Sequence, residues 1–166
     1  MFHIRKFISR EEGQALAEFA LVLPVLMLIL FGIVEFGRGF NYWNNATQIS
    51  AEGARFAIVN RKPDPSNTAS LQAQLLSQGS TTELRTGGST TLPTPAQVCI
   101  SFPNGTSNVG DPVQVSMTFT YHWLGVLDNV SKLIDKKKGF SASTTFTSSS
   151  TMRLEAPPTN YATGCA

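Results

Sequence analysis

An uncharged apolar run near the N-terminus constrains this chain more than any other feature. Residues 19–34 read FALVLPVLMLILFGIV and contain no charged side chain. A membrane-spanning helix needs about 20 mainly apolar residues, because each adds about 1.5 Å towards crossing a hydrocarbon core about 30 Å thick. Residues 14–34 supply that length if Glu18 is tolerated near one end. We therefore expect a single transmembrane helix within residues 14–38, loosened locally at Pro24, which lacks a backbone donor.

The alternative is a secretory signal peptide that is removed from the mature protein. The apolar run is longer than the hydrophobic region of such peptides, and no Ala-x-Ala site follows it; the nearest match, at residues 37–39, is Gly-Arg-Gly. Phe40, Tyr42 and Trp43 then follow, and aromatic residues suit the interface between membrane and water. These features favour a permanent membrane segment.

Flanking charges predict the orientation of this segment. Arg5, Lys6 and Arg10 precede the helix, whereas Arg38 follows it. Basic residues close to a membrane helix stay in the cytoplasm, and acidic residues such as those at positions 11 and 12 count little. We expect a single-pass protein with a cytoplasmic basic leader, residues 1–13, and an extracytoplasmic C-terminal part.

Glu18 is the residue that does not fit a plain membrane anchor. An ionised carboxylate at the edge of the hydrocarbon costs on the order of a few kcal/mol unless it is paired. One interpretation places it at the level of the lipid headgroups, where water solvates it. The other is that Glu18 waits for a cation as its partner.

The residues around Glu18 resemble the processing site of type IV pilin precursors. The resemblance rests on a basic leader, then GQALAEF at residues 13–19, then the apolar helix. It implies that a prepilin peptidase cuts between Gly13 and Gln14 on the cytoplasmic face. It also implies that the new amine of Gln14, usually methylated in that family, pairs with the glutamate of a neighbouring subunit.

A longer stretch, residues 11–60, resembles the TadE-like family, pseudopilins of tight-adherence (Flp-type) pilus systems. The resemblance is carried by GQALAEFALVLPVLMLILFGIVEFGR at residues 13–38 and by SAEGARFAIV at residues 50–59. Phe19 stands where the major pilins commonly carry tyrosine, and the chain is far longer than they are. The resemblance therefore implies a minor pseudopilin that acts in pilus assembly or a related secretion apparatus.

The family resemblance also implies partners and a location. The partners are the prepilin peptidase, other pilin subunits, the inner-membrane assembly platform and membrane lipid. The location is the bacterial inner membrane, or the pilus itself. Two alternatives stay open: a membrane-anchored extracytoplasmic module that is never cleaved, and a surface adhesin.

Beyond the membrane, the sequence predicts a helical extension over residues 39–62, ended by prolines at positions 63 and 65. Apolar and small residues recur there at spacings of three and four, which marks one buried stripe: Tyr42, Ala46, Ile49, Gly53 and Phe56. Residues 63–95 are rich in Ser, Thr, Gly and Pro and read as a linker with a short helix over residues 70–78.

Residues 96–166 carry strand patterns. Apolar and polar residues alternate over residues 98–102 and, without interruption, over residues 113–121. A third alternating stretch includes Phe140, Phe146 and Leu154, and helical spacing over residues 123–136 lies before it. The expected fold class is α+β: a long N-terminal transmembrane helix followed by a small antiparallel sheet domain packed on helices.

The two cysteines, Cys99 and Cys165, both follow the membrane segment. Disulfides persist outside the cytoplasm, and an even number of cysteines there favours a bridge. Two unrelated buried thiols are the alternative, but a buried thiol is out of place at the penultimate residue. We expect a bridge that pins the tail across the outer face of the domain.

The sequence offers little for catalysis, so we expect no enzyme, no cofactor and no metal site. His3 lies in the leader and His122 stands alone, so a zinc site would lack ligands. A nucleophilic pair of Cys99 and His122 would lack a group to orient the base. The net charge of +2 gives no sign of a nucleic-acid partner, and no motif for a small-molecule substrate is present.

Overall fold

A computed structural model describes residues 10–123 and 143–166 of the chain. The chain divides into two compact units, Met1–Gly37 and Arg38–Ala166. The first helix, α1 (Arg10–Ile58), belongs to both units and contains Pro24. The fold class is α+β, as the sequence predicts, with a long apolar N-terminal helix followed by a four-stranded antiparallel sheet and short helices.

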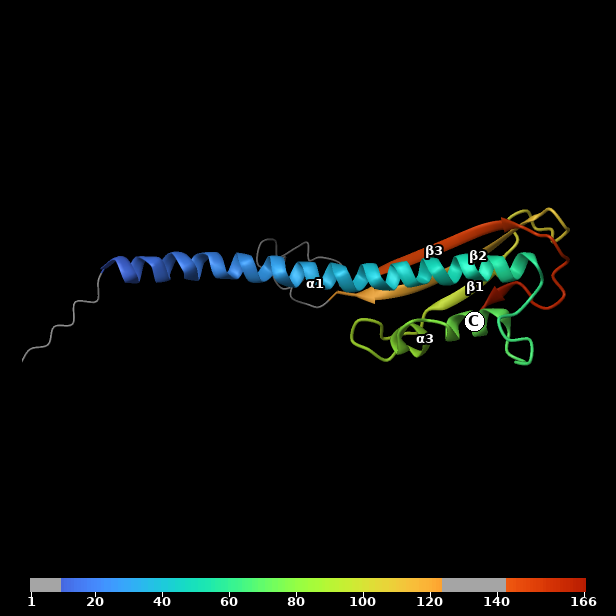
Figure 1. Cartoon of the computed structure of the whole chain (residues 1–166), viewed down its shortest axis with the longest axis horizontal. Coiled ribbons are helices and arrows are strands. Elements are labelled where there is room, and N and C mark those ends of the chain that lie inside the picture. Colours follow the sequence, from blue (N-terminus) through green and yellow to red (C-terminus); the bar gives the residue numbers. More distant parts are fainter. Residues whose placement is uncertain (1–9, 124–142) are drawn as a thin grey trace, which may run out of the picture. The chain divides into compact units, whose positions relative to one another are not determined.

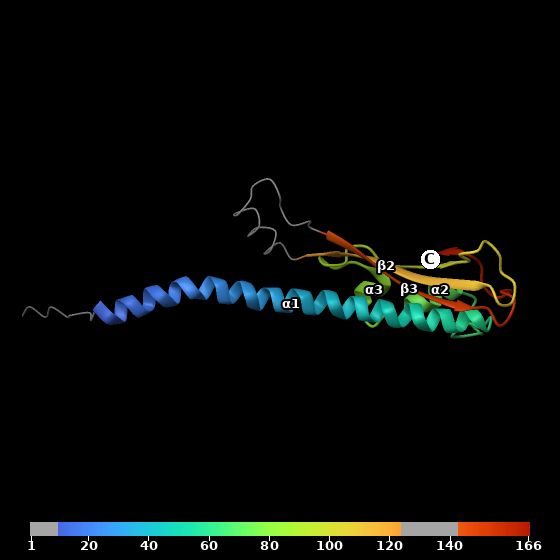
Figure 2. The ribbon, with the colours of Figure 1, turned by 90° about the horizontal axis from the view of Figure 1, so that it is seen from above.

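The second unit is built on a sheet whose strands lie in the order β3-β2-β1-β4. The strands are β1 (Gln97–Ser101), β2 (Pro112–His122), β3 (Ser143–Arg153) and β4 (Gly164–Cys165). Each neighbouring pair is antiparallel. The last part of α1 and two short helices, α2 (Leu71–Ser77) and α3 (Thr82–Thr86), lie on one side of this sheet (Figures 1 and 2).

The alternation in β2 is confirmed along its whole length. All five inward residues are buried, at most 2% exposed, and they form the centre of the core: Val113, Val115, Met117, Phe119 and Tyr121. Side chains point to alternate faces of a strand, so the same pattern leaves the hydroxyl-bearing residues on the opposite face. Two threonine pairs join β2 to β3 there, with oxygen–oxygen distances of 3.1 Å (Thr118–Thr147) and 3.3 Å (Thr120–Thr145).

The stripe predicted on the extension of α1 packs on this core. Tyr42, Ala46 and Ile49 are buried, and Tyr42 meets Phe119 with ring centroids 6.4 Å apart. At Gly53, α1 lies so close to α2 and β2 that a side chain would not fit. A Cβ there would lie 2.7 Å from Leu75 Cδ1 and 2.9 Å from Val115 Cγ1. The stripe is wider than predicted, since two further alanines, at positions 54 and 57, are also buried.

Three expectations about segment boundaries need correction. α1 ends at Ile58, before the prolines, because Asn60 adopts a positive φ of 51°. The Asn60 and Arg61 N–H groups donate to the Ala57 and Phe56 carbonyls, which is the Schellman ending of a helix. Residues 63–95 are more than a linker with one short helix: α2 is the expected helix, but α3 follows it and four leucines are buried in the core, Leu71, Leu75, Leu84 and Leu92.

The third correction concerns the C-terminal tail. β4 pairs with the edge of β1 and extends the sheet in its own plane, so the tail does not cross the outer face. The expected helix over residues 123–136 lies outside the described residues except for Trp123, as does the expected start of the third strand at Phe140 and Ala142. Within β3, Phe146 and Met152 are half-buried on the inner face, as the alternation predicts.

Candidate processing and assembly site

Gln14 and Glu18 lie one helical turn apart on α1. The Gln14 Nε2 donates a hydrogen bond of 3.1 Å to Glu18 Oε1. This contact follows from helix geometry, because side chains four residues apart share a face and tilt towards the N-terminus. Among the residues that the structure describes, this neutral amide is the group bonded to Glu18, and no lysine or arginine forms an ion pair with it.

Gly13 precedes Gln14 within the helical backbone of α1. The peptide bond between them joins the leader to the apolar segment, and Gln14 N is an amide in the uncut chain. Hydrolysis of this bond would turn that amide into an ammonium group. The new cation would lie about 6 Å along the helix axis from residue 18, at about 1.5 Å for each of four residues.

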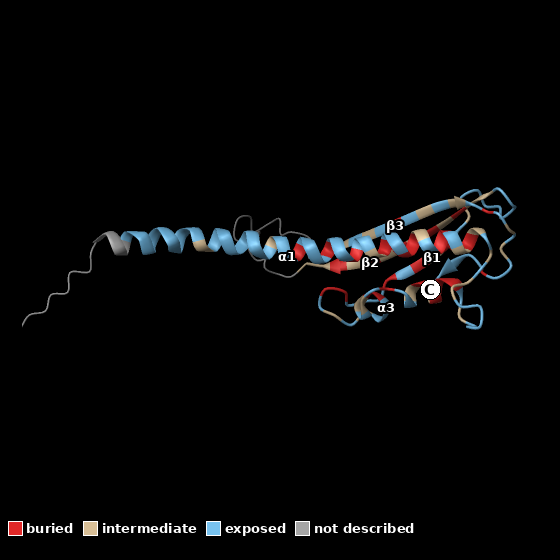
Figure 3. Ribbon diagram, viewed as in Figure 1, coloured by how far each residue is buried: buried red, intermediate tan, exposed pale blue. Residues whose placement is uncertain are grey.

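Most of the apolar segment around and after Glu18 is exposed in the part of the chain that the structure describes. Its most apolar 18-residue window has a mean hydropathy of 2.6, and 6% of that window is buried. Leu16, Leu21 and Ile33 are 64% to 75% exposed although they lie on different sides of the helix, and Figure 3 shows this part of α1 as exposed. A helix that is apolar all round needs a nonpolar surrounding, which a membrane supplies.

The aromatic residues after the membrane segment separate into two groups. Phe40 and Trp43 are 65% and 44% exposed, and their rings meet edge to face with centroids 6.0 Å apart. They are placed as residues of a membrane interface would be. Tyr42 was expected to join them, but it is 6% exposed and belongs to the core of the second unit.

Cys99 and Cys165 form a disulfide in the structure. They face each other across β1 and β4. Val98 and Ala166, the next pair along, exchange two backbone hydrogen bonds of 2.9 and 3.0 Å. Cys99 and Cys165 thus occupy a non-hydrogen-bonded position, where opposed side chains come closest. On the helix side, the buried Gln72 Nε2 donates to the Ala162 carbonyl at 2.8 Å.

The tail also caps the end of α1, which the sequence did not reveal. The N–H groups of Glu155 and Ala156 donate to the Ile58 carbonyl at 2.9 and 3.0 Å. The Tyr161 hydroxyl donates to the Ala57 carbonyl at 2.8 Å. The Asn60 side chain accepts backbone hydrogen bonds from residues 159 and 160. The one sequence signal was Asn60 itself, since asparagine tolerates the left-handed conformation that ends helices.

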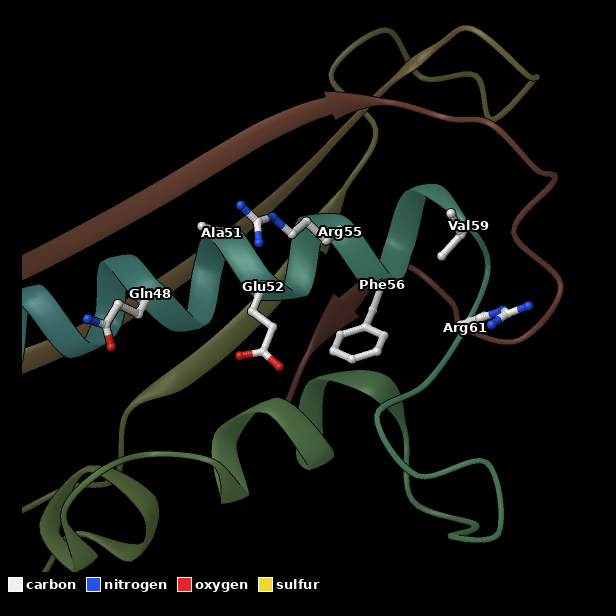
Figure 4. Close-up of a pocket in the computed structure, with 7 residues that line it drawn as sticks. All are labelled: Gln48, Ala51, Glu52, Arg55, Phe56, Val59 and Arg61. Carbon is white, nitrogen blue, oxygen red and sulfur yellow. The ribbon is translucent and has the colours of Figure 1, made fainter.

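An open groove of about 660 Å³ lies on α1 (Figure 4). Its charged lining residues are Glu52, Arg55 and Arg61, and Figure 4 shows Glu52 and Arg55 pointing in different directions from the helix. No nucleophile stands beside a base in it. Across residues 10–123 and 143–166, no group of three potential metal ligands occurs.

The two residues considered as a nucleophilic pair do not form one. Cys99 is bonded to Cys165 and is therefore not a thiol. His122 lies at the end of β2, where its backbone N–H donates to the Thr91 carbonyl at 2.7 Å. The other histidine, His3, lies outside the described residues.

Comparison with known proteins relates the N-terminal part of the chain to one family. Residues 13–55 match the family model of TadE-like proteins. The match begins at Gly13, covers Gln14 and Glu18, and ends near the end of α1. No curated protein and no solved structure matches the chain. The chain therefore carries a TadE-like segment, residues 13–55, which relates it to the proteins of the Tad pilus system.

Proposed function

We propose that this chain is a minor pseudopilin that acts in the assembly of a tight-adherence pilus or a related secretion apparatus. The observation that carries the proposal is the junction at residues 13–18. There, a TadE-like match begins at a glycine, and Glu18, which has no cationic partner among the described residues, lies one turn into an exposed apolar helix. Cleavage at that junction supplies the missing cation.

In this proposal, a prepilin peptidase cuts between Gly13 and Gln14 on the cytoplasmic face of the inner membrane. The Gln14 ammonium of one subunit then neutralises Glu18 of the next as their helices pack together. Burial away from water strengthens the attraction between the two charges, and pairing offsets part of the cost of burying the carboxylate, which would be largest if it stayed unpaired in an apolar bundle. Pairing thus favours packed subunits over separate ones.

The second unit is the extracytoplasmic part in this proposal. The Cys99–Cys165 bridge supports that location, because such bonds persist in oxidising compartments. Phe40 and Trp43 support a membrane boundary just before the sheet domain. The role is structural: the chain contacts peptidase, assembly platform, pilin subunits and lipid, and it transforms no small-molecule substrate.

Two fusions test the orientation. A reporter that is active only after export, joined to Ala166 through a flexible linker, should be active in cells. The linker is needed because the Ala166 backbone pairs with Val98. A reporter that requires the cytoplasm, fused at the same place, should be inactive. The reverse pattern would show that the C-terminal unit stays in the cytoplasm and would rule out the proposed function.

A further inference from the structure

Cleavage between Gly13 and Gln14 would make a glutamine the first residue of the mature chain. An N-terminal glutamine can close on itself: its α-nitrogen attacks Cδ, an N–Cδ bond forms, the Cδ–Nε2 bond breaks, and ammonia leaves. The product is the five-membered lactam pyroglutamate. The step needs no oxidant, reductant or second reactant, because both reacting groups belong to one residue.

Ring closure at Gln14 would remove the charge on which the proposed pairing depends. The lactam nitrogen is an amide nitrogen and carries no positive charge, so Glu18 would again lack a cationic partner. An unpaired carboxylate is costly in an apolar bundle. A mature chain that assembles through this pair must therefore keep Gln14 open.

The structure shows where the amide group of Gln14 is held. Its Nε2 donates to Glu18 Oε1 at 3.1 Å, and Glu18 lies one turn towards the C-terminal end of α1. The α-nitrogen of Gln14 lies on the opposite side of the residue, towards Gly13. Ring closure requires Cδ to come within bonding reach of that nitrogen, so an amide group held at Glu18 is not in a reactive geometry.

The charge of Glu18 acts in the same direction as its hydrogen bond. A nearby carboxylate favours the protonated form of an amine, and an ammonium group has no lone pair with which to attack Cδ. Among the described residues, no lysine or arginine forms an ion pair with Glu18. The carboxylate is therefore available to the new amine of its own chain before any neighbouring subunit arrives.

We infer that Glu18 protects the mature N-terminus, because it holds the Gln14 amide and keeps the Gln14 amine protonated, and both effects slow closure to pyroglutamate. The inference rests on the proposed function for the cut between Gly13 and Gln14. It assigns Glu18 a task within its own chain in addition to pairing between subunits. It also makes Gln14 a site where a chemical modification would switch off assembly.

Timed release of the mature N-terminus tests the inference on the full chain. The recognition sequence of a site-specific protease replaces the residues just before Gln14, so the protein is purified folded in detergent and then cut to expose Gln14. Mass spectrometry follows the N-terminal peptide over several days at mildly alkaline pH, where part of an ordinary α-amine is unprotonated. Ring closure is detected as the loss of one ammonia molecule from this peptide.

Variants at two glutamates of α1 give the comparison. Glu18→Ala should close Gln14 at least about two-fold faster than the native chain, which corresponds to the strength of one exposed pair four residues apart on a helix. Glu18→Gln keeps a hydrogen-bond acceptor without the charge, so its rate should lie between the two. Glu52→Ala removes the same kind of exposed side chain from a distant part of the helix and should match the native rate.

A rate of ring closure in Glu18→Ala equal to or below the native rate would overturn the inference. The N-terminus of the protein from its native membrane separates this outcome from failure of the proposed function. A chain that begins with a closed Gln14 would contradict protection but leave processing intact. A chain that still begins at Met1 would contradict processing, whereas the timed release still measures protection because the added protease makes the cut.

Discussion

Tyr161 joins the C-terminal tail to the end of α1 through one buried hydroxyl. The side chain is 8% exposed, and its hydroxyl donates to the Ala57 carbonyl. Burial raises the pKa of the Tyr161 phenol from 10.0 to about 12, since the charged phenolate would lose its hydration. The residue therefore couples the stability of the domain to alkaline pH.

The direction of the pH effect on stability depends on whether the folded or the unfolded chain loses the Tyr161 proton first. Between pH 10 and pH 12 the phenol ionises in the unfolded chain but stays protonated in the folded one, so folding becomes less favourable as pH rises through this window. The whole loss is on the order of 2 kcal/mol. Tyr161→Phe should remove this part of the pH dependence and cost about 1 kcal/mol at neutral pH through the lost hydrogen bond.

The measurement is urea unfolding of the detergent-solubilised chain at several pH values, followed by tryptophan fluorescence. The native chain should lose more stability than Tyr161→Phe between pH 10 and pH 12, and Tyr42 and Tyr121, present in both, serve as the internal reference. Parallel pH curves for the two proteins would show that Tyr161 is not the group that titrates.

Glu18 carries the second prediction at this scale. Glu18→Ala should leave membrane insertion intact, because it removes a charge from an apolar helix, but it should impair assembly, because the Gln14 ammonium loses its partner. Glu18→Gln is the matched control, since it keeps the length and polarity of the side chain without its charge. Pilus production is the readout, with membrane fractionation as the check on insertion. Production at the native level in the Glu18→Gln variant would count against charge pairing.

At the scale of elements, the sequence was most informative where a pattern was long and local. The uninterrupted alternation over residues 113–121 predicted β2, and the apolar run over residues 19–34 predicted the long, exposed apolar part of α1. Ser70 and Gln78, the ends expected for a short helix, are the N-cap and C-cap of α2. Each of these signals lies within one stretch of chain, so no knowledge of distant contacts was needed.

Short elements that depend on distant partners could not be predicted. β4 has only two residues, and they are a strand because they pair with the edge of β1. α3 has five residues, and its local signal is the Thr81 hydroxyl, which accepts from Leu84 N at 3.3 Å. The capping of α1 by the tail joins residues about 100 positions apart, such as Asn60 and Asn160. The spacing of apolar residues along the sequence indicates helices and strands, but it does not indicate contacts between residues so far apart in the chain.

The β1–β4 element leads to a stability prediction. The bridge closes a loop with a sequence separation of 66 residues, for which chain entropy gives a stabilisation of about 4 kcal/mol as an upper value. Cys99→Ser should therefore lower the melting temperature of the full chain in detergent and free the tail to fray. Cys165→Ser and the double variant should match it, because each change breaks the same bond.

Differential scanning calorimetry of the three variants, beside the native chain with and without reductant, makes the comparison. Labelling of native protein with a thiol reagent, without reductant, tests the bond itself. A melting temperature equal to the native value, or full labelling of both cysteines, would contradict a stabilising bridge.

At the scale of the whole molecule, two compact units have different tasks. The first supplies an apolar helix that is long enough to cross a membrane, and the second supplies a sheet domain with its own buried core. The TadE-like match, residues 13–55, covers the first unit from Gly13 onward and most of the α1 part of the second, and ends before the sheet. We infer that assembly depends on the matched segment and that the sheet domain distinguishes this subunit from the shorter major pilins.

The N-terminus of the protein isolated from its native membrane tests the central claim most directly. Processing by a prepilin peptidase predicts that the mature chain begins at Gln14, because that cut alone places a new amine one turn before Glu18. Mass spectrometry of the N-terminal peptide reads this out, and a Gly13→Val variant, whose bulkier side chain should block cleavage, provides the unprocessed reference. A mature chain that begins at Gln14 is the predicted result, and an assembled protein that still begins at Met1 would contradict the account.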